Sequence, residues 1–70
     1  MKKILISPDD VLIEIVLDDF VPGASFFVPC LNYTMAKDQI TRRMRTLKMR
    51  VRVEPRIENE TAGLRVWRRS

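Results

Sequence analysis

The chain has 70 residues, enough for one small domain and no more, and a chain of this length buries a modest share of its surface on folding. Hydrophobic residues make up 46% of it and charged residues 31%, a balance typical of a folded domain rather than of a disordered tail. The single cysteine excludes an internal disulfide, and the absence of histidine removes the commonest metal ligand and general base, so we expect an intracellular protein without metal or other cofactors.

Charge is divided unevenly along the chain. Residues 1–41 contain three Lys/Arg and six Asp/Glu, a net charge of −3, whereas residues 42–70 contain ten and three, a net charge of +7. The formal net charge is therefore +4. Such a polarity steers anionic partners toward the basic half of the molecule.

The first residues, MKKILI, have the positive start of an export signal, but their apolar run ends at Ser7-Pro8 and is too short for export. Elsewhere no segment approaches the roughly 20 apolar residues needed to cross a bilayer. We therefore expect neither export nor a membrane partner.

The first half of the chain predicts strands. A short strand is possible at Lys3–Ile6, and residues 11–18, VLIEIVLD, are β-branched and aliphatic, with one face fully apolar and the other half apolar. Such a strand is expected to be covered on both sides or to lie at an interface. Pro22-Gly23 is a strong turn signal, and residues 25–29, SFFVP, form the next strand. Residues 11–29 are thus predicted to form a hairpin.

From Asn32 or Thr34 the apolar period becomes helical, and either residue is a suitable N-cap. The spacing of the apolar positions predicts a helix of about fourteen residues with one narrow core face. Basic residues fall late in this helix, as its dipole favours, and Asp38 can pair with Arg42. The core face consists of Ala36, Ile40, Met44 and Leu47.

After Met49 apolar and charged residues alternate, which predicts an extended strand. The stretch IENETAG supplies a turn, and LRVWR forms a partner strand, so a second hairpin follows the helix. Pro55 cannot donate to a ladder, and it therefore marks either an edge or a bulge that shifts the residues after it.

Together these elements predict an α+β fold, a two-layer ββαββ domain with one helix on one face of a four-stranded mixed sheet. The core is thin, so self-association as a homodimer would help to stabilise it. Its predicted members are Ile13, Ile15, Leu17, Phe26, Val28, Ala36, Ile40, Met44, Leu47, Val51, Val53, Leu64 and Val66.

Arginines are the most distinctive residues of the basic half. Arginine forks bind phosphate oxygens through two hydrogen bonds, and an exposed indole can stack on a base. The predicted binding residues divide between the exposed helix surface, with Arg42 and Arg45, and the sheet face opposite the helix, with Arg50, Arg52, Arg65, Trp67 and Arg69.

Three interpretations of this basic surface remain open: a solvated face that discourages strand pairing, contact with nucleic acid, and contact with an acidic protein surface. For Trp67 the alternative to stacking is packing, because the large apolar area of tryptophan is usually mostly covered.

Catalytic groups are not recognisable, and we expect no enzyme. The neighbouring acids Asp9-Asp10 and Asp18-Asp19 are common in turns, and Cys30 reads as a small buried apolar residue because no histidine can activate it. Gly23 and Gly63 read as turn glycines, since neither belongs to a phosphate-binding motif.

The stretch PGASFFVPCLN, the basic helix after it, and VRVEPRIENETAGLRVWR resemble a group of small uncharacterised proteins of tailed bacteriophages. These share an SFFVP strand, a basic helix and a GLRVWR-like last strand, and the resemblance covers residues 17–68. It implies a protein that acts in the host cytoplasm by binding. The expected function is engagement of the nucleic-acid phosphate backbone through the basic sheet face. The alternative is inhibition of a host protein, such as a CRISPR effector or a transcription enzyme, and a third possibility is a virion or assembly component.

Overall fold

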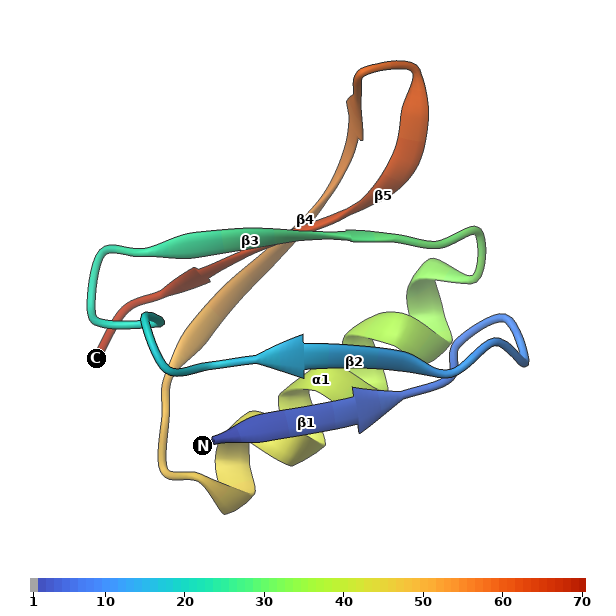
Figure 1. The fold of residues 1–70 in the computed structure, drawn as a ribbon. Helices are drawn as coiled ribbons and strands as arrows, with labels where there is room; N and C mark the ends of the chain where they lie inside the picture. Colours follow the sequence, from blue (N-terminus) through green and yellow to red (C-terminus); the bar gives the residue numbers. More distant parts are fainter. Residues whose placement is uncertain (1) are drawn as a thin grey trace.

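A computed structural model describes residues 2–70 as five strands and one helix (Figure 1). In chain order these are β1 (Lys3–Ile6), β2 (Ile13–Val16), β3 (Ser25–Pro29), α1 (Tyr33–Thr46), β4 (Val51–Glu58) and β5 (Thr61–Arg68). The α+β class is therefore confirmed.

The strands form two sheets, not the single four-stranded mixed sheet that was predicted. β1 pairs with β2, and β3, β5 and β4 form a three-stranded sheet in that order. Every pair is antiparallel. β3 and β4 nevertheless run in the same direction, because each pairs with β5, which lies between them. Helix α1 connects them and packs against β1, β4 and β5.

The predicted hairpin over residues 11–29 is wrong. β2 pairs instead with β1, which places Ile15 opposite Ile4 and Ile13 opposite Ile6 on the core side. The predicted turn at Pro22-Gly23 is present, but it connects the two sheets. The Gly23 amide donates to the Arg68 carbonyl on β5 at 2.9 Å, so the chain enters β3 already paired with β5.

Helix α1 follows the predicted apolar period. The Asn32 side chain accepts a hydrogen bond from the Met35 amide at 3.1 Å, which identifies Asn32 rather than Thr34 as the N-cap. At the other end the Lys48 amide donates to the Arg45 carbonyl and the Met49 amide to the Met44 carbonyl. These two bonds form a Schellman motif that reverses the chain into β4. Within residues 2–70 no helix is long and apolar enough to cross a membrane.

The second hairpin is confirmed, and its register runs without interruption from Val51 opposite Arg68 to Glu58 opposite Thr61. Its turn is only two residues long, Asn59-Glu60, and both have positive φ. Pro55 causes no bulge. Gly63 was predicted to lie in a turn, but it lies inside β5. A Cβ added at Gly63 would lie 2.2 Å from the Val28 carbonyl oxygen.

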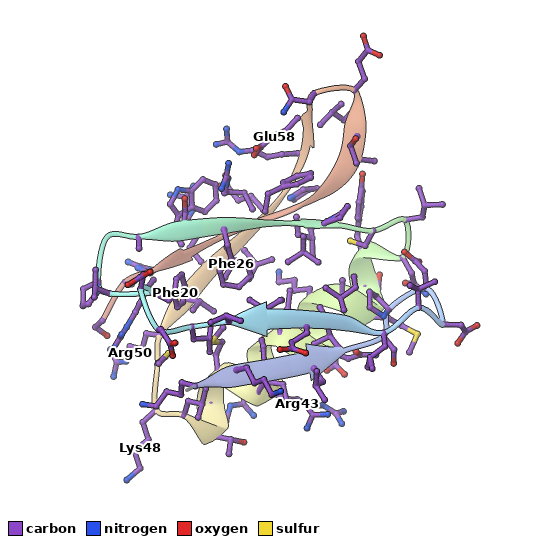
Figure 2. The ribbon with its side chains drawn as sticks, viewed as in Figure 1. Phe20, Phe26, Arg43, Lys48, Arg50 and Glu58 are labelled. Carbon is purple, nitrogen blue, oxygen red and sulfur yellow. The ribbon has the colours of Figure 1, made fainter. Side chains whose placement is uncertain are left out.

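One core joins the two sheets and the helix. All thirteen residues that were predicted for the core are buried or packed against it. Additional core residues come from places where the sequence pattern was short or irregular. They are Ile4 and Ile6 of β1, Phe20 of the loop after β2, Cys30 after β3, and Met49 after α1. Phe20 and Phe26 meet edge to face, with ring centroids 4.9 Å apart, where the two sheets approach each other (Figure 2).

Candidate functional site

The outer face of the three-stranded sheet, turned away from the core, carries alternate residues of the β4–β5 hairpin. Arg52 lies opposite Trp67, and Glu54 opposite Arg65, so both pairs share this face. Arg52, Arg65 and Trp67 thus lie on the predicted side of the sheet. Arg56 lies on the same face, because the absence of a bulge at Pro55 keeps the alternation intact.

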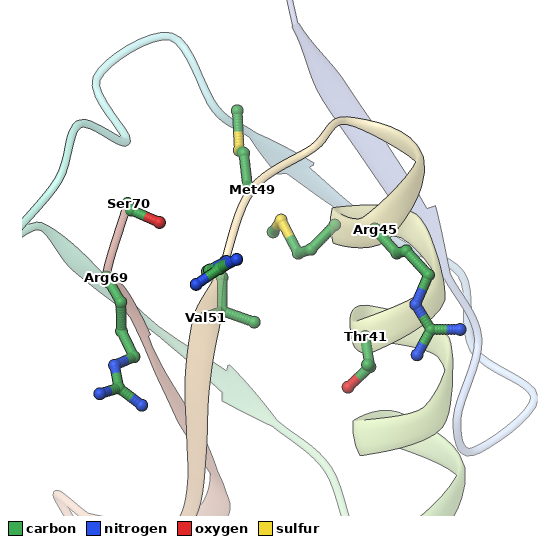
Figure 3. A pocket seen from close by; sticks show the side chains of 8 residues that line it. Thr41, Arg45, Met49, Val51, Arg69 and Ser70 are labelled. Carbon is green, nitrogen blue, oxygen red and sulfur yellow. The ribbon is translucent and has the colours of Figure 1, made fainter.

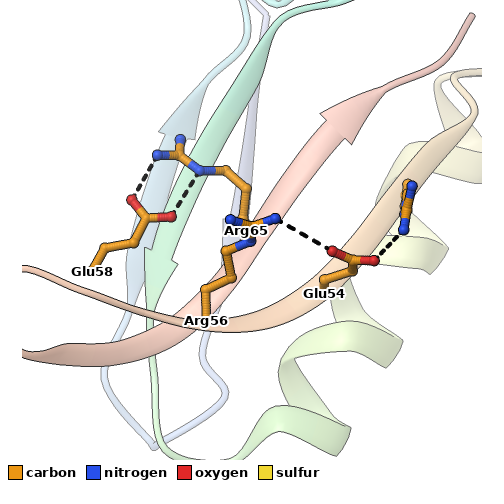
Figure 4. Close-up of polar contacts among 5 residues, drawn as sticks. Glu54, Arg56, Glu58 and Arg65 are labelled. Atoms are coloured by element: carbon orange, nitrogen blue, oxygen red, sulfur yellow. Dashed lines mark hydrogen bonds and ion pairs between the residues drawn. The ribbon is translucent and has the colours of Figure 1, made fainter.

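Two carboxylates pair with the three arginines of this face (Figure 4). Glu58 accepts two hydrogen bonds from Arg65, at 3.0 Å from Nε and 2.6 Å from one terminal nitrogen. Glu54 pairs with Arg52 and, at 3.6 Å, with Arg56. The outer face is therefore a lattice of alternating charge rather than an open basic platform.

Trp67 is covered on this face by guanidinium groups. The Arg56 guanidinium carbon lies 4.9 Å from the centroid of the indole ring and that of Arg52 lies 6.0 Å away. These are cation–π distances, and the tryptophan is half-buried. A base could stack on Trp67 only by displacing one of these arginines, so the structure favours the packing role of Trp67.

Other arginines have local structural partners. Arg42, predicted as a binding residue, pairs with Asp38 at 3.2 Å on the exposed side of α1. Arg43 donates to the Leu5 carbonyl of β1 at 3.4 Å, and Arg68 donates to the Phe20 carbonyl at 2.7 Å. Arg43 and Arg68 therefore tie the helix and the last strand to the two-stranded sheet and the loop that follows it.

Three predicted residues gather elsewhere, around a groove between α1 and the start of β4 (Figure 3). We call Arg45, Arg50 and Arg69 the groove arginines. The groove has a volume of about 630 Å³. The rest of its lining consists of Thr41, Met44, Met49, Val51 and Ser70.

Local structure explains why the groove arginines meet. Arg45 is in the last turn of α1, and the Schellman motif reverses the chain, so that Arg50 directly precedes β4 and lines the same groove. Arg69 donates its amide to the Arg50 carbonyl at 2.7 Å, which makes the two residues cross-strand neighbours. Figure 3 shows Arg45 and Arg69 on opposite sides of Val51.

Electrostatics distinguish this groove from the outer face. Within residues 2–70 none of the groove arginines forms an ion pair with a carboxylate. Their charges are permanent, because a guanidinium does not lose its proton in proteins. Lys48 and Arg50 lie at one end of the molecule, far from Glu58 at the other (Figure 2).

This groove takes arginines from both of the predicted surfaces, the helix and the sheet. Arg45 of the helix and Arg50 and Arg69 of the sheet line one groove, whereas Arg42, Arg52, Arg65 and Trp67 lie outside it. Thr41 and Met49 were missed as lining residues. The periodicity of a single element gives no signal for them, because the groove forms between elements.

The acids and the cysteine of the first half have structural roles. Asp9 accepts hydrogen bonds from the amides of Leu31 and Asn32, at 2.8 and 2.9 Å, and so ties the β1–β2 loop to the start of α1. Cys30 is buried, as predicted, and burial, followed by the negative charge of Asp9, raises the pKa of its thiol. In the described part of the chain no three Asp, Glu or Cys side chains are grouped as a metal site would require.

Comparisons with models of protein families, with curated proteins and with solved structures found no match.

Proposed function

We propose that this chain is a non-enzymatic binding protein of the phage type, acting in the host cytoplasm, whose basic groove engages the phosphate backbone of nucleic acid. The groove arginines carry the proposal, because they bring permanent positive charge together without an ion pair to any residue of the described chain. Each guanidinium offers five N–H donors in a planar fork that matches phosphate oxygens.

The energetics favour an anion at this position. Three like charges around one groove repel one another, and a bound phosphate replaces that repulsion with attraction. All three groove arginines are exposed, so salt screens this attraction and the affinity should fall as the salt concentration rises. On the outer face, by contrast, a phosphate would have to compete with Glu54 and Glu58 for the same guanidiniums.

The test is a fluorescence anisotropy titration of a labelled oligonucleotide at several salt concentrations. We expect Arg45→Gln, Arg50→Gln and Arg69→Gln each to weaken binding and to reduce the slope of log affinity against log salt by about 1. Arg42→Gln is the matched control, since it removes the same charge from the same helix at a residue that already has Asp38 as a partner.

Two outcomes would end the proposal. One is the absence of binding by the parent protein even at low salt. The other is an equal loss of affinity in Arg42→Gln and Arg45→Gln, which would show that net charge rather than the groove attracts the oligonucleotide. Circular dichroism of every variant separates these results from unfolding.

A second function, inhibition of a host protein by direct contact, is favoured by the opposite end of α1. There Leu31 is 82% exposed, Met35 is 48% exposed, and Val11 and Leu12 are exposed in the loop that Asp9 ties to this end. A pull-down from nuclease-treated bacterial lysate tests it. A stoichiometric protein that Leu31→Ser loses and Arg45→Gln retains would support inhibition, and retention by Leu31→Ser would oppose it.

A further inference from the structure

The basic groove combines two kinds of surface within one concave site. The groove arginines supply charge, and the half-buried Val51 supplies apolar area beside them. Met44 and Met49 are buried members of the core, so they support this surface from beneath. A volume of about 630 Å³ lies within the range of pockets that hold small organic molecules. A nucleotide has the matching combination, a charged phosphate joined to a flat, largely apolar base.

The strand beside the groove has an open edge. Glu58 and Thr61 flank a two-residue turn, and the Arg69 amide bonds to the Arg50 carbonyl, so the even-numbered residues of β4 are the ones bonded to β5. Val51 and Val53 therefore direct their N–H and C=O groups away from β5. Among residues 2–70 no further strand pairs with this edge. Base edges are themselves rows of donors and acceptors, and such an edge can bind them.

Double-stranded nucleic acid does not suit this site. A duplex presents its phosphates on a convex surface and keeps its bases stacked inside, so no base reaches a concave floor. A duplex instead requires charge spread over a flat or convex face. The outer face of the sheet is flat enough for a duplex, but there Glu54 and Glu58 compete with phosphates for the arginines.

We infer that the basic groove binds single-stranded nucleic acid, with an unstacked base against Val51 and the edge of β4 and the neighbouring phosphates on the groove arginines. This inference rests on the proposed function and adds the class of strand. Base contacts of this kind tolerate any sequence, because every base has an apolar face. The same geometry accommodates DNA and RNA.

The experiment compares three probes at one salt concentration: an oligothymidylate, an oligouridylate, and a blunt DNA duplex with the same number of phosphates. We expect both single strands to bind the parent protein several-fold more tightly than the duplex, because only a single strand presents an unstacked base to the groove. Polyglutamate serves as a fourth probe, because it carries negative charge without bases.

Thr41→Leu tests the floor of the groove without changing charge. The larger side chain is expected to reduce single-strand affinity several-fold and to leave the salt slope unchanged, because the phosphate contacts remain. Thr46→Leu is the matched control on the same helix, outside the groove lining. Both variants are exposed or half-buried substitutions on a helix surface, and their folding is checked by circular dichroism.

The results distinguish failure of the single-strand inference from failure of the proposed function. Equal or tighter binding of the duplex, or equal effects of Thr41→Leu and Thr46→Leu, would overturn the single-strand inference while leaving the proposed function intact. Binding of polyglutamate alone, with loss in Arg45→Gln, would overturn both and identify an acidic protein surface as the partner. Absence of binding to every probe would also overturn both.

Discussion

Arginine has different roles in this protein, and the neighbouring residues decide which role each one takes. Arg65 lies beside Glu58 and is held by two hydrogen bonds, so its charge is already balanced. Arg50 is preceded by Met49 and faces Arg69 across the strands, with no acid at cross-strand distance. Because an exposed ion pair contributes little to stability, the outer-face pairs mainly determine where anions are not attracted.

Gly63 should be the least replaceable residue of β5. An added Cβ would lie 2.2 Å from the Val28 carbonyl oxygen and 2.6 Å from the Phe27 ring, so Gly63→Ala must push apart β3 and β5. We expect it to reduce the free energy of unfolding by about 2–3 kcal/mol, the upper part of the range for overpacked sites.

Gly23→Ala is the comparison for this prediction, since Gly23 has open space around it and only its positive φ resists a side chain. Gly23→Ala should reduce the free energy of unfolding by about 1 kcal/mol. Urea denaturation measures both variants, and a smaller loss in Gly63→Ala than in Gly23→Ala would contradict the predicted contact.

Cys30 should make stability depend on alkaline pH. Burial, and then the charge of Asp9, raises the pKa of the thiol above the ordinary value of 9.0, so the unfolded chain loses this proton at lower pH than the folded protein does. The contribution of the protonated thiol to the free energy of unfolding is complete below pH 9.0. It is lost as the pH rises through the higher pKa of the folded state.

The Cys30→Ala variant lacks this ionisation and isolates its effect. We expect the stability difference between the parent protein and the variant to shrink as the pH rises above 9.0, while other alkaline titrations cancel. Urea denaturation across this range provides the measurement. A difference that stays constant would show that the thiol has the same pKa in the folded and unfolded states.

Elements that depend on neighbouring residues could be predicted from the sequence. The helix was predicted because Ala36, Ile40 and Met44 repeat on one face, and the last hairpin because its alternation continues through both strands. The pairing of β2 could not be predicted in the same way. β1 has only four residues. It pairs with β2 because this position buries Ile4 and Ile6 in a core that also needs the helix, which lies far away in the sequence.

Helix α1 ends with a strained residue that can be improved. Lys48 occupies the left-handed position of the Schellman motif with φ of 59°, where glycine is the usual residue. We expect Lys48→Gly to increase the free energy of unfolding by about 0.5–1 kcal/mol, since it relieves the strain at the cost of some added freedom in the unfolded chain.

Lys48→Ala keeps the strain and removes the same charge, so it should give no gain. Thermal denaturation of the two variants beside the parent protein makes the comparison. A similar change of melting temperature in both would mean that the lysine charge, not the backbone, determines the effect.

The assembly of the groove is a property of the whole molecule. The sequence indicated Arg45, Arg50 and Arg69 individually, but it separated them into helix and sheet surfaces. They meet because the helix ends where it does, the chain reverses at Lys48, and β5 returns antiparallel to β4. Two of these three conditions are local, and the third depends on pairing across the whole hairpin. Binding sites formed between elements are therefore harder to predict than the elements.

The open edges of the sheets affect whether two copies of the molecule associate by strand pairing. Beside β1 the helix bonds two outward groups, since the Ser7 amide donates to Gln39 and Arg43 donates to the Leu5 carbonyl. β3 and β4 are both outer strands, and each carries a proline at an outward position. Pro55 has the parity of Val51 and Val53, and Pro29 alternates with Cys30, whose amide bonds to Ala62 of β5. Neither proline therefore offers a donor to an incoming strand.

Restoring these donors should promote association between molecules. We expect the double variant Pro29→Thr, Pro55→Thr to sediment as larger species than the parent protein at equal concentration, because threonine favours strands and adds an N–H at each open edge. Val53→Thr is the control, since it introduces the same side chain beside Pro55 without adding a donor. Sedimentation velocity over a range of concentrations distinguishes the three proteins. An unchanged distribution in the double variant would show that features other than proline protect these edges, whereas a shift in Val53→Thr as well would assign the effect to the threonine side chain.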